Sequence, residues 1–189
     1  RDAYQAGATY LDRDGDGYAC EKQFNVYVLG DRPQPTTPTS LPSPKTTSIT
    51  SLTIISVGDG DTVRVAVEGR PVTVRLACID APETAQEYGK DASIALKMLL
   101  PQGTKVTIDR KATDRYGRTV AELNAADKNV SLEMVRLGAA WVYEQYLDAC
   151  PLTAAVLREA ERNARTQKAG LWKMENPTPP WEFRRARRT

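Results

Sequence analysis

Histidine is absent from the 189 residues of this sequence. Mechanisms in which imidazole acts as a general base, a nucleophile or a metal ligand are therefore excluded. Long apolar runs are absent too: no stretch reaches the roughly 18 apolar residues of a transmembrane helix, so we expect no membrane span.

Cysteine is scarce, and the odd number of three leaves at least one thiol without a partner inside the chain. Cys78 and Cys150 fall in the same predicted domain, so they could form a disulfide in an oxidising compartment. Alternatively, Cys78 is a small buried apolar residue of a strand. The sequence leaves both alternatives open.

Acidic and basic residues are nearly balanced, with a formal net charge of +2, so the chain as a whole is not a polycation. The C-terminus is nevertheless basic, with arginines at positions 184, 185, 187 and 188. Such a cluster is either a solvated, frayed tail or an arm that binds phosphate groups. We expect Trp181 and Phe183, which precede it, to dock on the main domain.

A segment rich in proline, threonine and serine divides the sequence, and its composition favours an extended linker over a packed core. The hydrophobic fraction of 41% is sufficient for one folded domain beside a smaller module. We therefore expect four parts: an N-terminal module at residues 1–30, a linker at 31–50, a main domain at 51–175 and a basic C-terminal tail at 176–189.

The main domain contains both strand and helix patterns. Strands are expected at residues 52–57, 62–67, 72–76, 105–109 and 119–123. Helices are expected at 90–100, 131–137 and 152–168, the last two ended by Gly138 and Gly170. The side chains that the first helix could bury are Ile94, Leu96, Met98, Leu99 and Leu100. This pattern predicts a mainly β fold with α elements, a five-stranded OB-fold barrel with three packed helices.

The N-terminal module carries acidic residues at alternate positions. Asp12, Asp14 and Asp16 occupy the first, third and fifth positions of a loop, and Gly17 occupies the sixth. These are the offsets of a calcium-binding loop, in which a glycine permits a sharp turn around the ion. The alternative is an acidic turn that holds no ion.

The residues that follow extend this pattern. The carbonyl of Tyr18 would supply the next ligand. Gln23 stands where such loops usually end in a glutamate, and Glu21 could serve instead. The segment resembles the excalibur extracellular calcium-binding module, whose signature the sequence matches at Asp12, Asp14, Asp16, Gly17, Cys20 and Glu21. We expect a structural Ca²⁺ there.

Three clusters in the main domain collect carboxylates and arginines after the ends of predicted strands, at residues 58–62, 75–83 and 114–118. Each alone has a plain explanation as a turn or a strand end. Loops of one barrel can bring them together, however. They would then supply carboxylates for a hard cation, a glutamate to act on water and arginines for a phosphate. Metal-assisted phosphodiester hydrolysis requires this set.

The sequence from about residue 51 to 172 resembles a domain of the staphylococcal nuclease (thermonuclease) family. The matching motifs are Gly-Asp-Gly-Asp-Thr-Val at 58–63, Val-Arg-Leu at 74–76, Ile-Asp-Ala-Pro-Glu-Thr at 79–84, Tyr-Gly at 88–89, Asp-Arg-Tyr-Gly-Arg at 114–118, Met-Val-Arg-Leu-Gly at 134–138 and Gly-Leu-Trp at 170–172. The family fold is an OB barrel with three helices, which agrees with the pattern of predicted elements.

The resemblance implies a catalytic Ca²⁺ site. Asp61 and Asp80 would bind the ion through their carboxylates, and Ala81 would bind it through its backbone carbonyl. Ala81 stands where the family often has threonine, a change that keeps the carbonyl. Asp59 would lie next to these ligands without contacting the ion itself.

The resemblance also implies how the substrate is held and cleaved. Glu83 would orient or deprotonate the attacking water, while Arg75 and Arg118 would grip the scissile phosphate. Cleavage at the 5′ P–O bond would leave 3′-phosphates on DNA and RNA. Tyrosines flank the nucleotide pocket in the family: Tyr116 matches in place, and Tyr143 and Tyr146 are candidates. Alternatively, Tyr143 belongs to the core together with Trp141.

These expectations together describe a Ca²⁺-dependent, sugar-non-specific nuclease that acts as a monomer and prefers single-stranded substrates. The sequence begins with Arg1, and we expect a bacterial protein that is secreted, periplasmic or on the cell surface, with its signal peptide outside this sequence. The alternatives are a catalytically inactive OB-fold module that binds nucleic acid or protein, and a calcium-dependent surface adhesion protein. An intact catalytic set favours the nuclease.

Overall fold

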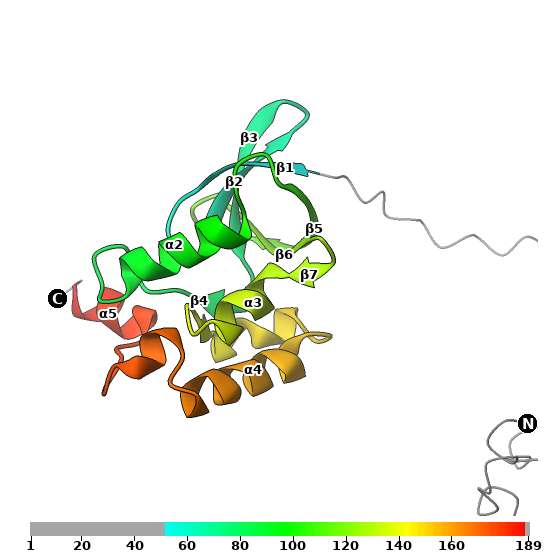
Figure 1. Cartoon of the computed structure of the whole chain (residues 1–189). Coiled ribbons are helices and arrows are strands. Elements are labelled where there is room, and N and C mark those ends of the chain that lie inside the picture. The colour runs from blue at the N-terminus through cyan, green and yellow to red at the C-terminus, as the bar shows by residue number, and fades with distance from the viewer. Residues whose placement is uncertain (1–51, 188–189) are drawn as a thin grey trace, which may run out of the picture. The chain divides into compact units, whose positions relative to one another are not determined.

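Five strands close into a barrel, as the sequence predicts (Figure 1). They are β1 (Leu52–Val57), β2 (Thr62–Val67), β3 (Arg70–Leu76), β5 (Lys105–Thr113) and β6 (Thr119–Ala125). Hydrogen bonds join them in the order β3-β2-β1-β5-β6, and a parallel pairing between β3 and β6 completes the circle. The short strand β7 (Lys128–Asn129) pairs antiparallel with the end of β6. Closure leaves none of the five strands with an unpaired side.

The computed structural model describes residues 52–187. The predicted linker and the predicted N-terminal calcium ligands Asp12, Asp14, Asp16, Tyr18 and Glu21 lie outside the described residues, as does Arg188.

Alternating side chains of the strands fill the barrel. The buried set includes Ile54, Val63, Val65, Val74, Leu76, Val106, Ala121 and Leu123. These positions follow the period of two in the sequence, because successive side chains of a strand point to opposite faces. The register of β2 on β3 pairs Thr62 with Arg75 and therefore brings the start of one strand beside the end of the other.

The three predicted helices are present as α2 (Gly89–Leu99), α3 (Val130–Arg136) and α4 (Ala154–Thr166). The side chain of Asn129 caps α3 by accepting a hydrogen bond from the Leu132 N–H. A two-stranded pairing joins β4 (Ile79–Asp80) to β8 (Trp141–Val142). Two 3₁₀ segments, η3 (Glu144–Ala149) and η4 (Gly170–Lys173), flank α4.

One prediction about α2 is wrong in part. The helix buries Leu96, and Leu100 after its end is buried too, but the side chains of Ile94 and Met98 are 53% and 77% exposed. The buried face runs through Gly89, Ala92, Ser93 and Leu96, a spacing of three and four residues that turns Ile94 and Met98 toward solvent.

The chain ends in a further helix, α5 (Pro180–Ala186), within the segment expected to be a basic tail. Pro180 occupies its first turn, where the missing N–H costs nothing. Trp181 stacks on Tyr143, with ring centroids 5.3 Å apart and planes 5° from parallel, and meets Trp141 edge to face. These ring contacts dock α5 on the main domain.

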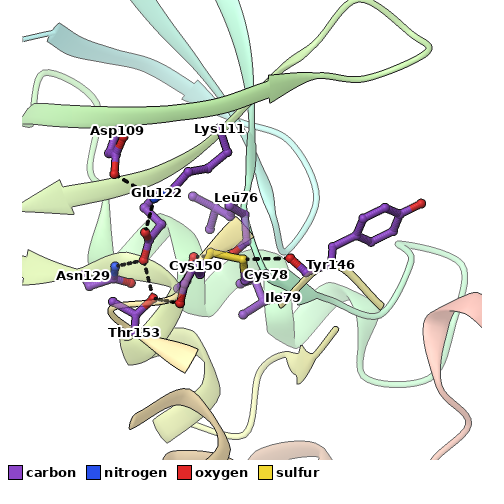
Figure 2. Close-up of a disulfide and its surroundings, with 12 residues drawn as sticks. Leu76, Cys78, Ile79, Asp109, Lys111, Glu122, Asn129, Tyr146, Cys150 and Thr153 are labelled. Atoms are coloured by element: carbon purple, nitrogen blue, oxygen red, sulfur yellow. Dashed lines mark hydrogen bonds and ion pairs between the residues drawn. A yellow bond between two sulfur atoms is a disulfide. The ribbon is translucent and has the colours of Figure 1, made fainter. Parts of the chain in front are cut away.

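A disulfide joins Cys78, which lies between β3 and β4, to Cys150, which follows η3 (Figure 2). Both cysteines are buried. Beside the disulfide, the buried carboxylate of Glu122 accepts hydrogen bonds from Asn129 and Thr153 and pairs with Lys111 at 2.8 Å. The bridge spans 72 residues and thereby constrains the segment that leads into β4.

Two glycines allow the ends of α3 and α4 to meet, where the sequence predicts helix ends. Gly138 has φ of +63°, and a Cβ built on it would lie 2.2 Å from the carbonyl oxygen of Ala169. Gly170 has φ of +56°, and a Cβ built on it would lie 2.3 Å from the carbonyl oxygen of Gly138. The Leu171 N–H donates to that carbonyl at 2.9 Å, which fixes the approach.

Replacing Gly138 with alanine should therefore destabilise the domain strongly. The left-handed backbone alone costs alanine about 1–2 kcal/mol, and the clash with Ala169 adds about 1–3 kcal/mol. Gly103→Ala is the matched control, because Gly103 has φ of +88° but nothing within 4 Å of its added Cβ. Urea unfolding of both variants measures the difference, and equal losses would contradict the close approach at Gly138.

Candidate active site

The predicted site residues Asp61, Arg75 and Asp80 meet because of the strand register. Asp61 directly precedes β2, Arg75 lies near the end of β3, and Asp80 ends β4. The Leu76 N–H donates to the Asp61 carbonyl at 2.8 Å, which continues the β2–β3 ladder past the strand end. Three side chains from separate sequence motifs thus lie at one end of the barrel.

Arg75 is held on all sides at the centre of this cluster. Its Nη2 lies 3.1 Å from an Asp61 oxygen and 2.8 Å from an Asp80 oxygen. Its Nη1 donates to the carbonyls of Leu76 and Ile79 at 2.9 and 3.0 Å. These contacts fix the orientation of the guanidinium before any ligand arrives.

The two aspartates are almost fully buried, with 5% and 0% of Asp61 and Asp80 exposed. Burial raises the pKa of Asp61 to about 7 against the opposing effect of Arg75, and the neighbouring Asp59 and Asp80 raise it further. The Ala81 N–H donates to Asp61 at 2.9 Å. The site thus concentrates negative charge that lacks full compensation.

The donors present suit a hard divalent cation. Carboxylate and carbonyl oxygens are the ligands that Ca²⁺ prefers, and Asp61 and Asp80 supply two carboxylates. A buried oxygen of Asp59, Oδ1, has no hydrogen-bond partner among residues 52–187, which is consistent with a missing positive charge nearby. No group of three or more acidic, histidine or cysteine side chains is placed to hold a metal within this part of the chain. The Ala81 carbonyl and water or substrate oxygens would have to complete the coordination.

Glu83 lies in the loop between β4 and α2. Its backbone N–H donates to the side chain of Gln86, and the Gln86 N–H donates back to the Glu83 carbonyl. Gly89, at the start of α2, packs so closely that a Cβ would overlap the Glu83 carbonyl oxygen. The loop is therefore tightly closed, while the Glu83 side chain remains about one third exposed.

Arg118 reaches the cluster from the turn between β5 and β6. Asp114 anchors it, accepting from its backbone N–H at 2.9 Å and from its Nε at 2.7 Å. Its Nη1 lies 3.4 Å from the hydroxyl of Thr62, which in turn donates to Asp61. The second predicted arginine is thereby linked to Asp61 through Thr62.

The three predicted substrate tyrosines differ in their surroundings. Tyr116 is 65% exposed, and the guanidinium groups of Arg115 and Arg118 lie over its ring. Tyr146 is also exposed and meets the edge of Tyr143. Tyr143 is partly buried, and Trp181 covers a face of its ring. Tyr116 and Tyr146 therefore have ring surface available to a ligand, whereas Tyr143 is shared with α5.

Arg184 of α5 is a member of the cluster that sequence reasoning missed. Its Nη2 lies 2.6 Å from Asp80 Oδ2, and its Nη1 lies 2.7 Å from Glu83 and 3.1 Å from Asp80 Oδ1. Partial burial lowers the pKa of its guanidinium, but hydrogen bonds to the two carboxylates outweigh this and raise the pKa above its usual value. The sequence offers no local signal that separates Arg184 from Arg185, since both lie within one helical turn of Trp181 behind a helix-starting proline.

The raised pKa of Asp61 predicts a pH-dependent effect on stability. The folded state favours the protonated form of Asp61. Its contribution to the free energy of unfolding is therefore lost as the pH rises from its ordinary pKa toward about 7. In chelator, Asp61→Asn should therefore be stabilising relative to wild type at pH 8, on the order of 1–4 kcal/mol more than at pH 5.

Urea unfolding at both pH values measures this difference. Asp127→Asn removes an exposed carboxylate and controls for net charge. A pH-dependent difference no larger in Asp61→Asn than in this control would contradict the raised pKa.

Two family models match this chain. Residues 73–174 match the family model described as staphylococcal nuclease homologue, and residues 1–21 match the Excalibur calcium-binding domain. The nuclease match includes Arg75, Asp80, Glu83 and Arg118, while Asp61 precedes it and α5 follows it.

Several curated proteins are similar over the main domain. A protein of Escherichia coli O157:H7 named "Uncharacterized endonuclease" is 44% identical over 132 residues, which cover 69% of this chain and 82% of that protein. A "Micrococcal nuclease" of Shigella flexneri is 37% identical over 142 residues, 70% of this chain and 79% of that protein. An "Uncharacterized endonuclease" of Haemophilus influenzae is 38% identical over 133 residues, 70% and 71% of the two chains.

The predicted barrel, the arrangement of acidic residues and arginines at one end of it, and these similarities agree with one another. No helix in the described part has the length and apolarity needed to cross a membrane. The resemblance inferred from the sequence is confirmed: this chain belongs to the family of staphylococcal nuclease homologues, and its main domain is that of a hydrolytic nuclease.

Proposed function

We propose that the protein is a Ca²⁺-dependent nuclease that hydrolyses phosphodiester bonds in DNA and RNA at the 5′ P–O bond, leaving 3′-phosphates. We further propose that it acts as a monomer and prefers single strands. One observation carries the proposal: Arg75 is fixed between two buried aspartates, and Glu83 is joined to the same cluster through Arg184. This cluster combines a cation site, a phosphate-binding arginine and a carboxylate that can act on water.

The arginines would act on the phosphate. Their planar guanidinium groups donate paired hydrogen bonds and stay charged, so they favour the additional negative charge of a pentacoordinate transition state. Arg75 is already oriented by two backbone carbonyls, and Arg118 is oriented by Asp114. Neither side chain has to be ordered when substrate arrives, which lowers the entropic cost of the step.

Glu83 would hold the attacking water and accept its proton. Its carboxylate is partly exposed beside the buried aspartates, so water can reach it. The closed loop around Gln86 and Gly89 limits the positions that this carboxylate can take. A base held in this way favours attack from one side of the phosphate.

Asp61 and Asp80, with the Ala81 carbonyl, would hold the catalytic Ca²⁺. When bound, the ion would polarise a phosphoryl oxygen and make nearby water more acidic. Asp59 would add negative charge behind these ligands and so strengthen cation binding. Ca²⁺ would also favour the ionised form of Asp61, whose pKa is raised chiefly by burial.

Tyr116, Tyr143 and Tyr146 would form the nucleoside side of the site. A base stacked on a tyrosine gains about 1–3 kcal/mol. Tyr116 and Tyr146 offer the more accessible rings. Recognition by stacking does not read the sugar, which suits a nuclease that accepts both DNA and RNA.

The N-terminal module would bind a second, structural Ca²⁺ through Asp12, Asp14, Asp16, the Tyr18 carbonyl and Glu21. The similarity to the Excalibur calcium-binding domain supports this assignment. Together with a disulfide, which persists in oxidising compartments, it supports a secreted or surface location. We propose that the module serves a surface role beside the nuclease.

Digestion of single-stranded DNA by the full chain tests the function. Cleavage should require Ca²⁺, stop in excess chelator and fall by about 10²–10⁴-fold in Glu83→Gln. Glu87→Gln, an exposed change in the same loop, is the matched control and should retain activity. A wild-type chain that binds DNA without cutting it in Ca²⁺ would instead indicate the inactive binding module.

Arg75→Lys should lower kcat by about 10²–10³-fold, because lysine keeps the charge but cannot donate the paired hydrogen bonds of a guanidinium. The unfolding free energy should also fall, by about 1–3 kcal/mol, since lysine cannot satisfy both backbone carbonyls. Arg64→Lys, an exposed change on β2, should alter neither quantity. Single-turnover cleavage and urea unfolding measure them, and near wild-type kcat in Arg75→Lys would remove Arg75 from the mechanism.

A further inference from the structure

Helix α5 contacts the proposed active site at three points. Trp181 stacks on Tyr143, and the side chain of Gln86 donates to the carbonyl of Thr178 just before the helix. Arg184 forms the third contact, with Asp80 and Glu83. The first two contacts position the helix, and the third brings a positive charge to the proposed cation ligand.

We propose that Arg184 is a positioning residue that neutralises Asp80 and Glu83 when no cation is bound and must release Asp80 when a divalent cation binds. Its docking then competes with the cation and sets the apparent cation affinity. This inference rests on the proposed function of Asp80 as a cation ligand.

Both carboxylate oxygens of Asp80 accept hydrogen bonds from arginines. Its Oδ1 accepts from both Arg75 and Arg184, at 2.8 and 3.1 Å. Its Oδ2 accepts from Arg184 at 2.6 Å, and among the residues described no other donor to Oδ2 is found. Since Ca²⁺ binds carboxylate oxygens at about 2.3–2.6 Å, a cation on Oδ2 would occupy the place of the Arg184 guanidinium.

The buried negative charge of Asp80 makes its positive partners compete. Asp80 is fully buried, so it requires a positive partner in the folded state. The Arg184 guanidinium and a divalent cation at the same Oδ2 would repel each other at close range, whereas Arg75 contacts Asp80 only through Oδ1. Each can therefore satisfy Asp80, but docking of one disfavours binding of the other, which is a reciprocal coupling.

The surroundings of Arg184 leave room for its side chain to move. Its side chain is one third exposed, and a pocket of about 410 Å³ lies beside it, lined also by Glu83, Thr84, Ala85, Phe183 and Arg187. The guanidinium can therefore move away from Asp80 while α5 stays docked. Movement into this pocket would keep it near Glu83, its second partner.

Calorimetric titration with Ca²⁺ tests the proposal without using nuclease activity. The full chain is used throughout, with Asp14→Asn and Asp16→Asn present in every variant to silence the predicted N-terminal loop. In this background, Arg184→Gln should bind Ca²⁺ about 5- to 150-fold more tightly. Arg185→Gln, which removes an exposed arginine from the same helix, should change the affinity less than about twofold.

Two further measurements separate competition from a purely structural role. Adding Asp80→Asn should abolish the affinity gain of Arg184→Gln, because the contested ligand is gone. Arg184→Gln should lower Tm in chelator more than in saturating Ca²⁺, whereas a merely structural arginine would give equal losses.

Unchanged or weaker Ca²⁺ binding in Arg184→Gln would overturn the proposal, and so would the absence of binding in the background chain. A chain that gains Ca²⁺ affinity in Arg184→Gln but cuts no nucleic acid would sink the proposed function alone. The two failures are therefore distinguishable.

Discussion

Two carboxylates buried at one end of the barrel are the constraint on which the rest of the site depends. Asp61 and Asp80 have almost no exposed surface, and a buried charge requires a partner or loses its ionisation. The chain has no histidine to share this charge. Arg75 and Arg184 are the positive groups that contact them in the described structure. Burial raises the pKa of Asp61 to about 7 although Arg75 opposes this effect.

Barrel closure makes this arrangement possible. The β2–β3 register places Thr62 opposite Arg75, and the parallel β3–β6 pairing places Val120 on the other side of the same arginine. Arg75 therefore belongs to a strand with neighbours on both sides, and its side chain emerges where those ladders end. The disulfide at Cys78 ties the next segment to Cys150. A core of apolar side chains thus supports a site made of charged side chains.

The sequence predicts the barrel and the principal site residues for identifiable reasons. Strands with a period of two reveal their buried face locally, and acidic or arginine-rich loops after strand ends point to one rim. Side-chain burial on α2 was harder to predict, because Ile94 and Met98 are apolar and yet face solvent. Their exposure depends on which helix face the barrel covers, and this is a tertiary fact.

Arg184 escaped sequence reasoning for a similar reason. A run of arginines near a chain end is typical of a solvated tail, and nothing local separates Arg184 from Arg185. The difference arises because Trp181 docks and fixes the rotation of α5. The disulfide depends on the fold in the same way. Cys78 and Cys150 lie in one predicted domain, which permits a bridge, but only the folded chain brings them together.

The parallel β3–β6 pairing has a consequence for the order of folding. It joins segments that are far apart in sequence, and such contacts form late because a long loop must close first. Arg75 and Arg118 therefore come together only when the barrel is complete. During synthesis on the ribosome, the carboxylates emerge well before the second arginine, and α5 emerges after both. A nascent chain is thus without an assembled candidate site until β6 has been made and the barrel has closed.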